Sequence, residues 1–156
     1  MRAALIAVML MIGSQAGAFF HDKDLTRDSL SSFRIYVAIN DYAEGGCWTN
    51  LREARQYAEE KLRSSGFDVV QDGETSGADV KKYFFHINVN GQRVFANQQG
   101  PCVGNVEISM SGWTRVNKIL HIATIGEMSW SLSTRKDNMN RLVLQRLSEV
   151  FLLFPK

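Results

Sequence analysis

The sequence predicts an α+β fold: a mixed, mostly antiparallel sheet of about five to six strands with two helices on one face. Three observations support this fold class. Most of the chain after residue 32 consists of short segments in which apolar and polar residues alternate. Two further segments repeat their apolar residues with a helical period. The predicted order is β-α-β-β-β-β-α, and each helix has a single apolar stripe, so both are expected to cover the same sheet face.

The first 18 residues, MRAALIAVMLMIGSQAGA, have the features of a secretory signal peptide. Arg2 supplies a positive start, a short apolar stretch follows, and Ala16-Gly17-Ala18 fits a small-residue cleavage site. The apolar stretch falls well short of the roughly 20 residues that a membrane-spanning helix needs. Cleavage would leave Phe19 as the first residue and no membrane span in the mature chain. We therefore predict an exported protein, periplasmic or secreted, with an N-terminal arm (19–32) and a single α+β domain (33–156).

The first half of the domain predicts strand, helix and strand. Residues 33–39, FRIYVAI, alternate as a half-buried strand does, and a loop is expected from residue 40 to 48. Asn50 and Glu53 are spaced as a capping box, so a helix is predicted from about residue 50 to 65, ending at Gly66. A short strand, 67–70, follows. Strand, helix and strand of these lengths predict a right-handed crossover between parallel strands.

The second half predicts antiparallel strands and a closing helix. KYFFHINVNGQRVFAN, residues 82–97, is interpreted as a hairpin turned at Asn90-Gly91, which would set Ile87 opposite Val94 on the core-like face. A strand is predicted from about residue 104 to 116. Residues 119–132 follow a turn at Asn117-Lys118 as one long or broken strand. The final helix is expected from about residue 137 to 153.

The two cysteines, Cys47 and Cys102, are predicted to form a disulfide. An exported chain meets conditions in which thiols oxidise, and the sequence lacks the C-x-x-C spacing of redox motifs. In the chain-entropy model, closing a loop of this length contributes roughly 4 kcal/mol. The alternative is a catalytic thiolate, because Cys47 follows Gly45-Gly46 and precedes a helix N-terminus, where thiol pKa values fall.

The predicted hairpin register leaves a second sheet face on which aromatic and polar residues alternate. Aromatic residues and arginine are enriched in protein interfaces, so this face is a candidate binding surface. It is open if both helices cover the other face, and closed if the arm, residues 19–32, folds over it. Trp113 is a further candidate. The predicted open-face residues are Tyr36, Phe84, His86, Asn88, Arg93 and Phe95.

No residue pattern indicates a metal, a cofactor or nucleic acid. The histidines, His21, His86 and His121, are not spaced as a metal site, and none of the common hydrolase or phosphate-binding motifs occurs. The net charge is +2, falling to +1 once Arg2 is removed, with no basic run to neutralise phosphates. Asp41 and Glu44 near Cys47 fit a solvated loop.

The leading functional hypothesis is therefore a small, exported, non-catalytic domain that binds another protein or an envelope component. One alternative is a small hydrolase or transferase that uses Cys47 with Asp41. A second is a carrier with a small-ligand pocket between sheet and helices. The order of elements resembles that of several small exported α+β domains, among them the N-terminal domain of the Tol–Pal system's periplasmic propeller protein. This likeness concerns the order of elements and supplies no site residue.

Overall fold

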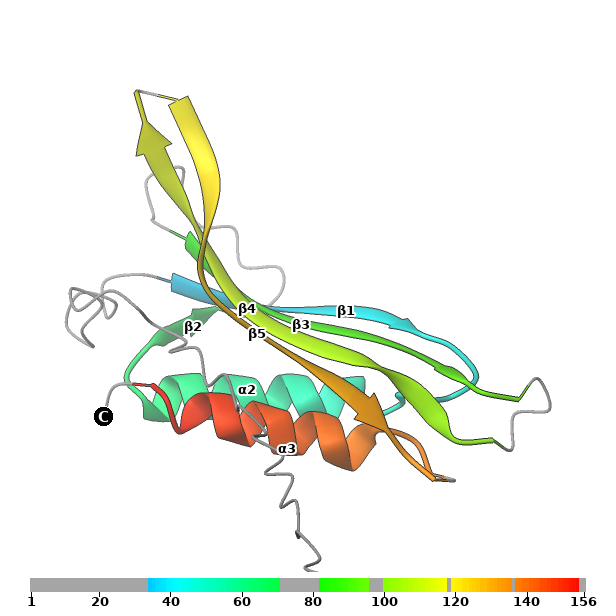
Figure 1. Cartoon of the computed structure of the whole chain (residues 1–156). Helices are drawn as coiled ribbons and strands as arrows, with labels where there is room; N and C mark the ends of the chain where they lie inside the picture. The colour runs from blue at the N-terminus through cyan, green and yellow to red at the C-terminus, as the bar shows by residue number, and fades with distance from the viewer. Residues whose placement is uncertain (1–33, 71–81, 96–99, 118, 136, 155–156) are drawn as a thin grey trace, which may run out of the picture.

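The computed structural model describes residues 34–70, 82–95, 100–117, 119–135 and 137–154. Within these ranges a five-stranded mixed sheet lies over two helices, which confirms the predicted α+β class (Figure 1). The predicted signal peptide and arm, residues 1–32, lie outside the described residues. The elements are β1 (Arg34–Ala43), α2 (Leu51–Ser64), β2 (Asp68–Val70), β3 (Lys82–Arg93), β4 (Cys102–Val116), β5 (Ile119–Ser133) and α3 (Asn140–Phe151).

The strand order across the sheet is β2-β1-β3-β4-β5. β1 runs parallel to both β2 and β3, so the predicted parallel pair around α2 is confirmed. β3, β4 and β5 follow one another as antiparallel neighbours, and these ladders are the longest in the sheet. The pairing of Thr114 with His121 matches the register expected for a turn at Asn117-Lys118. Asn117 takes a positive φ of 52°, a conformation that asparagine tolerates better than most residues.

Both helices cover the same face of the sheet, and the core lies between the two layers (Figure 1). α2 buries Ala54, Ala58 and Leu62 along one side, in agreement with the single apolar stripe predicted for it. It ends at Ser64, and Gly66, whose φ of 90° suits glycine, lets the Phe67 N–H donate to the Leu62 carbonyl and close the helix. The buried side chains of α3 are Val143, Leu147 and Val150, with Met139 and Phe154 buried at its two ends.

The predicted two-residue hairpin at Asn90-Gly91 is wrong. β3 runs through both residues to Arg93 and pairs along its whole length with β1 or β4. The chain reverses between residues 94 and 101, where the Val94 N–H donates to the Pro101 carbonyl. Val94, predicted on the core face opposite Ile87, instead lies outside the strand and is 51% exposed.

Close packing explains the glycine at position 91. A Cβ added to Gly91 would overlap the Met139 side-chain methyl, and Gly91 pairs across the ladder with Gly104. A Cβ on Gly104 would in turn overlap the Asn90 carbonyl oxygen. At Asn90-Gly91 the backbone of β3 therefore lies very close to the backbone of β4, and Met139 packs on Gly91. The dipeptide is typical of a turn, but here it lies inside a strand.

Two smaller details also differ from the expectation: the end of the first strand and the cap of the first helix. β1 continues to Ala43, so the loop expected from residue 40 begins only at residue 44. The Asn50 and Glu53 side chains bond to each other (Asn50 Nδ2 to Glu53 Oε2, 2.8 Å), and no side-chain cap to the backbone forms at Asn50. The helix nevertheless starts at the expected place, because the Ala54 N–H donates to the Asn50 carbonyl.

The packing at Gly91 gives a double-mutant test. Gly91→Ala should lower the free energy of unfolding by about 1–3 kcal/mol, because the new methyl group overlaps Met139. In a Met139→Ala background the same change should cost clearly less, since the overlapping atoms are gone. Chemical denaturation of the four proteins in the cycle measures this coupling. Equal costs in the two backgrounds would contradict the packing explanation.

Candidate interaction surface

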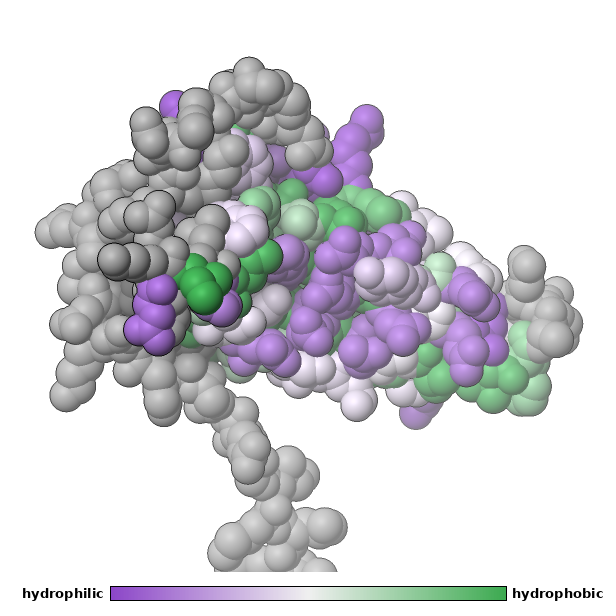
Figure 2. Space-filling view, turned by 90° about the horizontal axis from the view of Figure 1, so that it is seen from above, coloured by the Kyte–Doolittle hydropathy of each residue, from purple (hydrophilic) through white to green (hydrophobic). Residues whose placement is uncertain are grey.

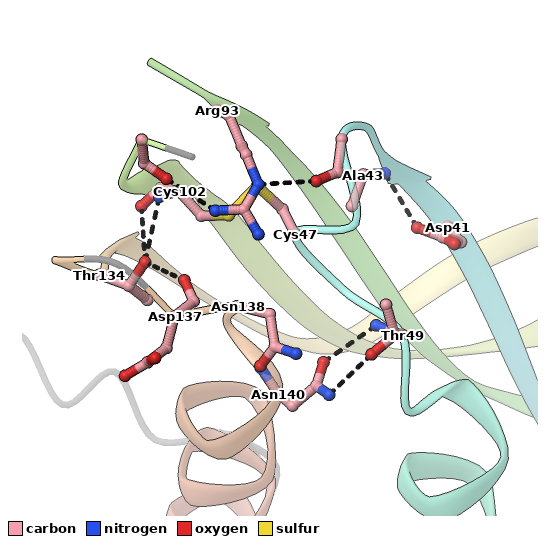
Figure 3. Close-up of a disulfide and its surroundings, with 12 residues drawn as sticks. Asp41, Ala43, Cys47, Thr49, Arg93, Cys102, Thr134, Asp137, Asn138 and Asn140 are labelled. Atoms are coloured by element: carbon pink, nitrogen blue, oxygen red, sulfur yellow. Dashed lines mark hydrogen bonds between the residues drawn. A yellow bond between two sulfur atoms is a disulfide. The ribbon is translucent and has the colours of Figure 1, made fainter. Parts of the chain in front are cut away.

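The loop between β1 and α2 is held by a covalent junction at one end of the sheet. Cys47 and Cys102 are both fully buried and form the predicted disulfide, with their Cα atoms 5.6 Å apart (Figure 3). Gly45 and Gly46 have φ values of 61° and 68°, and the Cys47 N–H donates to the Glu44 carbonyl. Two successive positive φ values closed by this bond are characteristic of a type I′ turn, which favours glycine at both positions.

Hydrogen bonds around the disulfide join it to α3. The Met139 N–H donates to the Cys47 carbonyl at 2.6 Å, at the residue just before the helix begins. Asn140 bonds twice to Thr49, by accepting from the Thr49 N–H and donating to its hydroxyl, each at 2.9 Å (Figure 3). Thr134 exchanges backbone and hydroxyl bonds with Cys102. The junction therefore fixes the β1–α2 loop, the start of β4 and the start of α3 together.

This geometry removes the predicted alternative of a catalytic thiolate. The Cys47 sulfur is bonded to Cys102, so neither cysteine is free to act as a nucleophile. The two glycines serve the turn that delivers Cys47 to its partner. Among the described residues, no group of three or more His, Cys, Asp and Glu side chains gathers as a metal site would require.

Arg93 also belongs to the junction and does not lie on the predicted open face. Because β3 is continuous, alternation places Arg93 with Ile87 and Val89 on the side that the helices cover. Its guanidinium donates to the carbonyls of Gly45 (2.8 Å) and Gly100 (2.7 Å), which ties two loops together (Figure 3). Phe95, expected on the same open face, lies beyond the end of β3 and is 60% exposed.

The other four predicted residues share the face opposite the helices, as expected. Tyr36 on β1 stacks on Phe84 of β3 with ring centroids 5.8 Å apart, and Phe84 stacks on His86 at 5.9 Å. The His86 imidazole Nε2 lies 2.9 Å from the Ser111 hydroxyl on β4. These rings form a short aromatic row that crosses two strands, and each ring is half-buried.

A hydrogen-bonded polar row crosses three strands beside the aromatic row. Asn88 accepts from the Asn40 amide at 2.6 Å and donates to the Glu107 carboxylate at 2.8 Å. The three residues are register partners on β1, β3 and β4. The face opposite the helices accordingly shows hydrophilic groups interleaved with apolar ones (Figure 2). We use "open face" for the surface formed by Tyr36, Phe84, His86, Asn88, Asn40, Glu107 and Ser111.

Sequence reasoning missed Asn40, Glu107 and Ser111, because their place depends on register between strands. The sequence pattern places Asn40 in a loop, although the residue continues the alternation of Tyr36 and Ala38. Trp113 follows Ser109 and Ser111 on the same side of β4 and is 46% exposed, consistent with its candidate place. Tyr42, at the far end of β1, falls in the same predicted loop and is 65% exposed.

The environment of His86 disfavours its charged form. Partial burial lowers the pKa of the imidazole below its ordinary value, and the negative charge of Glu107 opposes this in part. The open face therefore carries a neutral histidine near neutral pH.

The lowered pKa of His86 predicts a dependence of stability on pH. The unfolded chain binds the proton more readily than the folded chain, so the free energy of unfolding should fall as pH drops below about 6.5. His86→Gln, which keeps a polar partner for Ser111, should make this decline shallower. Denaturant unfolding above and below that pH, on both proteins, measures the difference. The same pH slope in both would be evidence against this assignment.

The disulfide junction predicts a larger effect on stability. Cys47→Ala/Cys102→Ala, or reduction of the native protein, should lower the free energy of unfolding by about 2–5 kcal/mol, because the bridge closes a loop across 55 positions. Denaturation with and without reductant checks this, and the double variant is the control that reductant should leave unchanged. A fast-reacting thiol in native, oxidised protein would overturn the assignment.

Comparisons with known proteins give a fold but no family. No family model matches the chain, and no curated protein matches it significantly. Solved structures do. A PelC dodecamer from Paraburkholderia phytofirmans is 16% identical, with 80% of this chain covering 90% of that chain at a TM-score of 0.51. The hypothetical protein CT253 from Chlamydia trachomatis is 12% identical, with coverage of 78% and 94% at a TM-score of 0.41.

A minor lipoprotein from Acinetobacter baumannii is 11% identical, with coverage of 78% of this chain and 92% of that chain and a TM-score of 0.35. At these identities the likeness to PelC shows a shared fold alone, and the two weaker likenesses carry no argument. None of the helices in the described part of the chain has the length and apolar character needed to cross a membrane.

Proposed function

We propose that this chain is an exported, non-catalytic domain that acts by binding protein, copies of itself included, and that the open face takes part in this binding. The observation that carries the proposal is the pre-ordered row Asn40–Asn88–Glu107 beside the stacked rings of Tyr36 and Phe84. Side chains already fixed by one another lose little conformational entropy when a partner docks. Aromatic rings next to such groups are typical binding anchors.

Three further observations support export and association. The disulfide suits an oxidising compartment, and the leader-like residues 1–18 point the same way. The PelC structure, which shares the fold, is a dodecamer. The partner is then a protein in the periplasm or outside the cell, either another envelope component or a second copy.

The two alternative functions have less support. The cysteine-dependent hydrolase needs a free Cys47 thiol, which the disulfide consumes. The carrier needs a cavity between sheet and helices, where the buried side chains instead pack into one contiguous core. A non-catalytic binding domain is left as the function that the geometry favours.

Site-specific photo-crosslinking in cells tests the proposal. A photoreactive residue at Tyr42, which is exposed on the same sheet face, should form a defined protein adduct, whereas one at Gln56 on the outer side of α2 should not. Phe84→Ala should reduce the Tyr42 adduct strongly, since truncated anchor residues typically cost about 2 kcal/mol or more of binding free energy.

Gln145→Ala, an exposed change on α3, is the matched control and should leave the adduct unchanged. Thermal melts of both variants show whether the fold is intact. The absence of any Tyr42-specific adduct, or an adduct insensitive to Phe84→Ala in a folded protein, would refute the role of the open face.

A further inference from the structure

Within the described residues, the outer edge of β5 is the longest edge of the sheet that no other strand pairs with. β5 is the last strand in the order, and within the described residues no strand bonds to its outer side. It has 15 residues, which corresponds to a length of roughly 50 Å at about 3.4 Å per residue. β2, at the opposite edge, has three residues. A long edge exposes backbone N–H and C=O groups that another strand can satisfy.

The composition of β5 does little to protect this edge. Proteins commonly guard an edge strand with lysine, proline or several charges. The sequence of β5, ILHIATIGEMSWSLS, contains no proline, lysine or arginine, and Glu127 is its one acidic residue. Serine occupies most of its exposed positions near the C-terminal end, where Ser129, Ser131 and Ser133 alternate along the strand. Such an edge fits pairing with another strand.

The N-terminal part of β5 forms a two-stranded extension with the end of β4, which we call the β4–β5 ribbon. The register shifts between Met110 and Ser111, and beyond this point the two strands bend away from the rest of the sheet (Figure 1). Among the described residues, β3 pairs with β4 only as far as Gly112, and residues 113–116 and 119–122 pair with each other as a ribbon of two strands. Trp113 pairs with Ile122, which is 61% exposed, and Ile119 is 62% exposed. A two-stranded ribbon with exposed apolar groups is marginal in water by itself.

Resting on the self-association included in the proposed function, we infer that a second copy of this chain docks on β5. The two β5 strands pair antiparallel about a two-fold axis and join the two sheets into one continuous sheet. Charge favours a copy as the occupant, because the strand has one acidic side chain and its self-pairing meets no like-charge repulsion in any register that keeps Glu127 from facing itself. A symmetric interface also buries the exposed apolar residues of the β4–β5 ribbon of both copies.

Charge substitutions on β5 test this interface by sedimentation velocity of the purified protein over a range of concentrations. Ser129→Lys gives each copy the residue with which natural edge strands block pairing, so it should weaken self-association by about tenfold or more. Inside one copy, Ser129 pairs with Glu107, so the new charge is not repelled in the monomer. Gln56→Lys, the same charge change at an exposed position of α2, is the control and should leave association unchanged.

A variant without added charge provides a second measurement. Ile122→Ser removes exposed apolar surface from the β4–β5 ribbon and should also weaken association. Hydrogen exchange of β5 amides should slow as concentration rises in the native protein and stay fast in Ser129→Lys.

The outcomes separate this interface from the open face. Loss of the dimer in Ile122→Ser, with the Tyr42 crosslink retained, supports the β5 interface, because Ile122 lies outside the open face whereas Ser129 pairs with its member Glu107. A protein that stays monomeric at every concentration overturns it. An oligomer that depends on Phe84 but not on Ser129 or Ile122 also overturns it, and the open-face proposal then stands.

Discussion

The Cys47–Cys102 disulfide joins three parts of the chain that otherwise meet only through non-covalent contacts. It holds the β1–α2 loop against the first residue of β4, and hydrogen bonds between this loop and Met139 and Asn140 extend the connection to the start of α3. Since α3 packs against both α2 and the sheet, this junction sets where the second helix begins over the core. The register of β3 with β4 starts at the pair Arg93–Cys102, directly beside the bridge. The bridge therefore anchors the end of the sheet at which the pairing of β3 with β4 begins.

The two faces of the sheet differ because alternation sends apolar and polar residues to opposite sides. Phe85, Ile87 and Val89 of β3 are fully buried under the helices. Phe84, His86 and Asn88 lie on the other side, where they contact Tyr36, Ser111 and Glu107 of the neighbouring strands instead of packing into a second core. The Asn88 amide oxygen accepts from Asn40, and its nitrogen donates to Glu107. A surface ordered in this way is suited to recognition, since its side chains are positioned before a partner arrives.

The sheet also ends very differently at its two edges. β2 is short and its first residue, Asp68, is engaged by Arg34 in an ion pair at 3.3 Å. β5 is long and nearly uncharged, and its N-terminal part exposes apolar residues in the β4–β5 ribbon. An edge of this kind is a hazard for a protein that must stay monomeric, and a ready interface for one that assembles. The open face and the β5 edge are thus separate surfaces, one defined by side chains and the other by backbone.

Local patterns in the sequence determined the fold class, the helices, the parallel β1–β2 pair, the faces of Tyr36, Phe84, His86 and Asn88, and the disulfide. Each depends on alternation, helical period or cysteine count, which the chain carries within a short window or in its composition.

The tertiary structure decided the course of the chain at Asn90-Gly91. Turn chemistry favoured a hairpin there, but the pairing with Gly104 and the packing of Met139 require a glycine in extended backbone. That one difference moved Arg93 to the helix side and Phe95 out of the sheet, and it brought Glu107 beside Asn88. Register between distant strands depends on contacts that no local window contains, so the polar row and the place of β5 at the edge become evident only once the sheet is assembled.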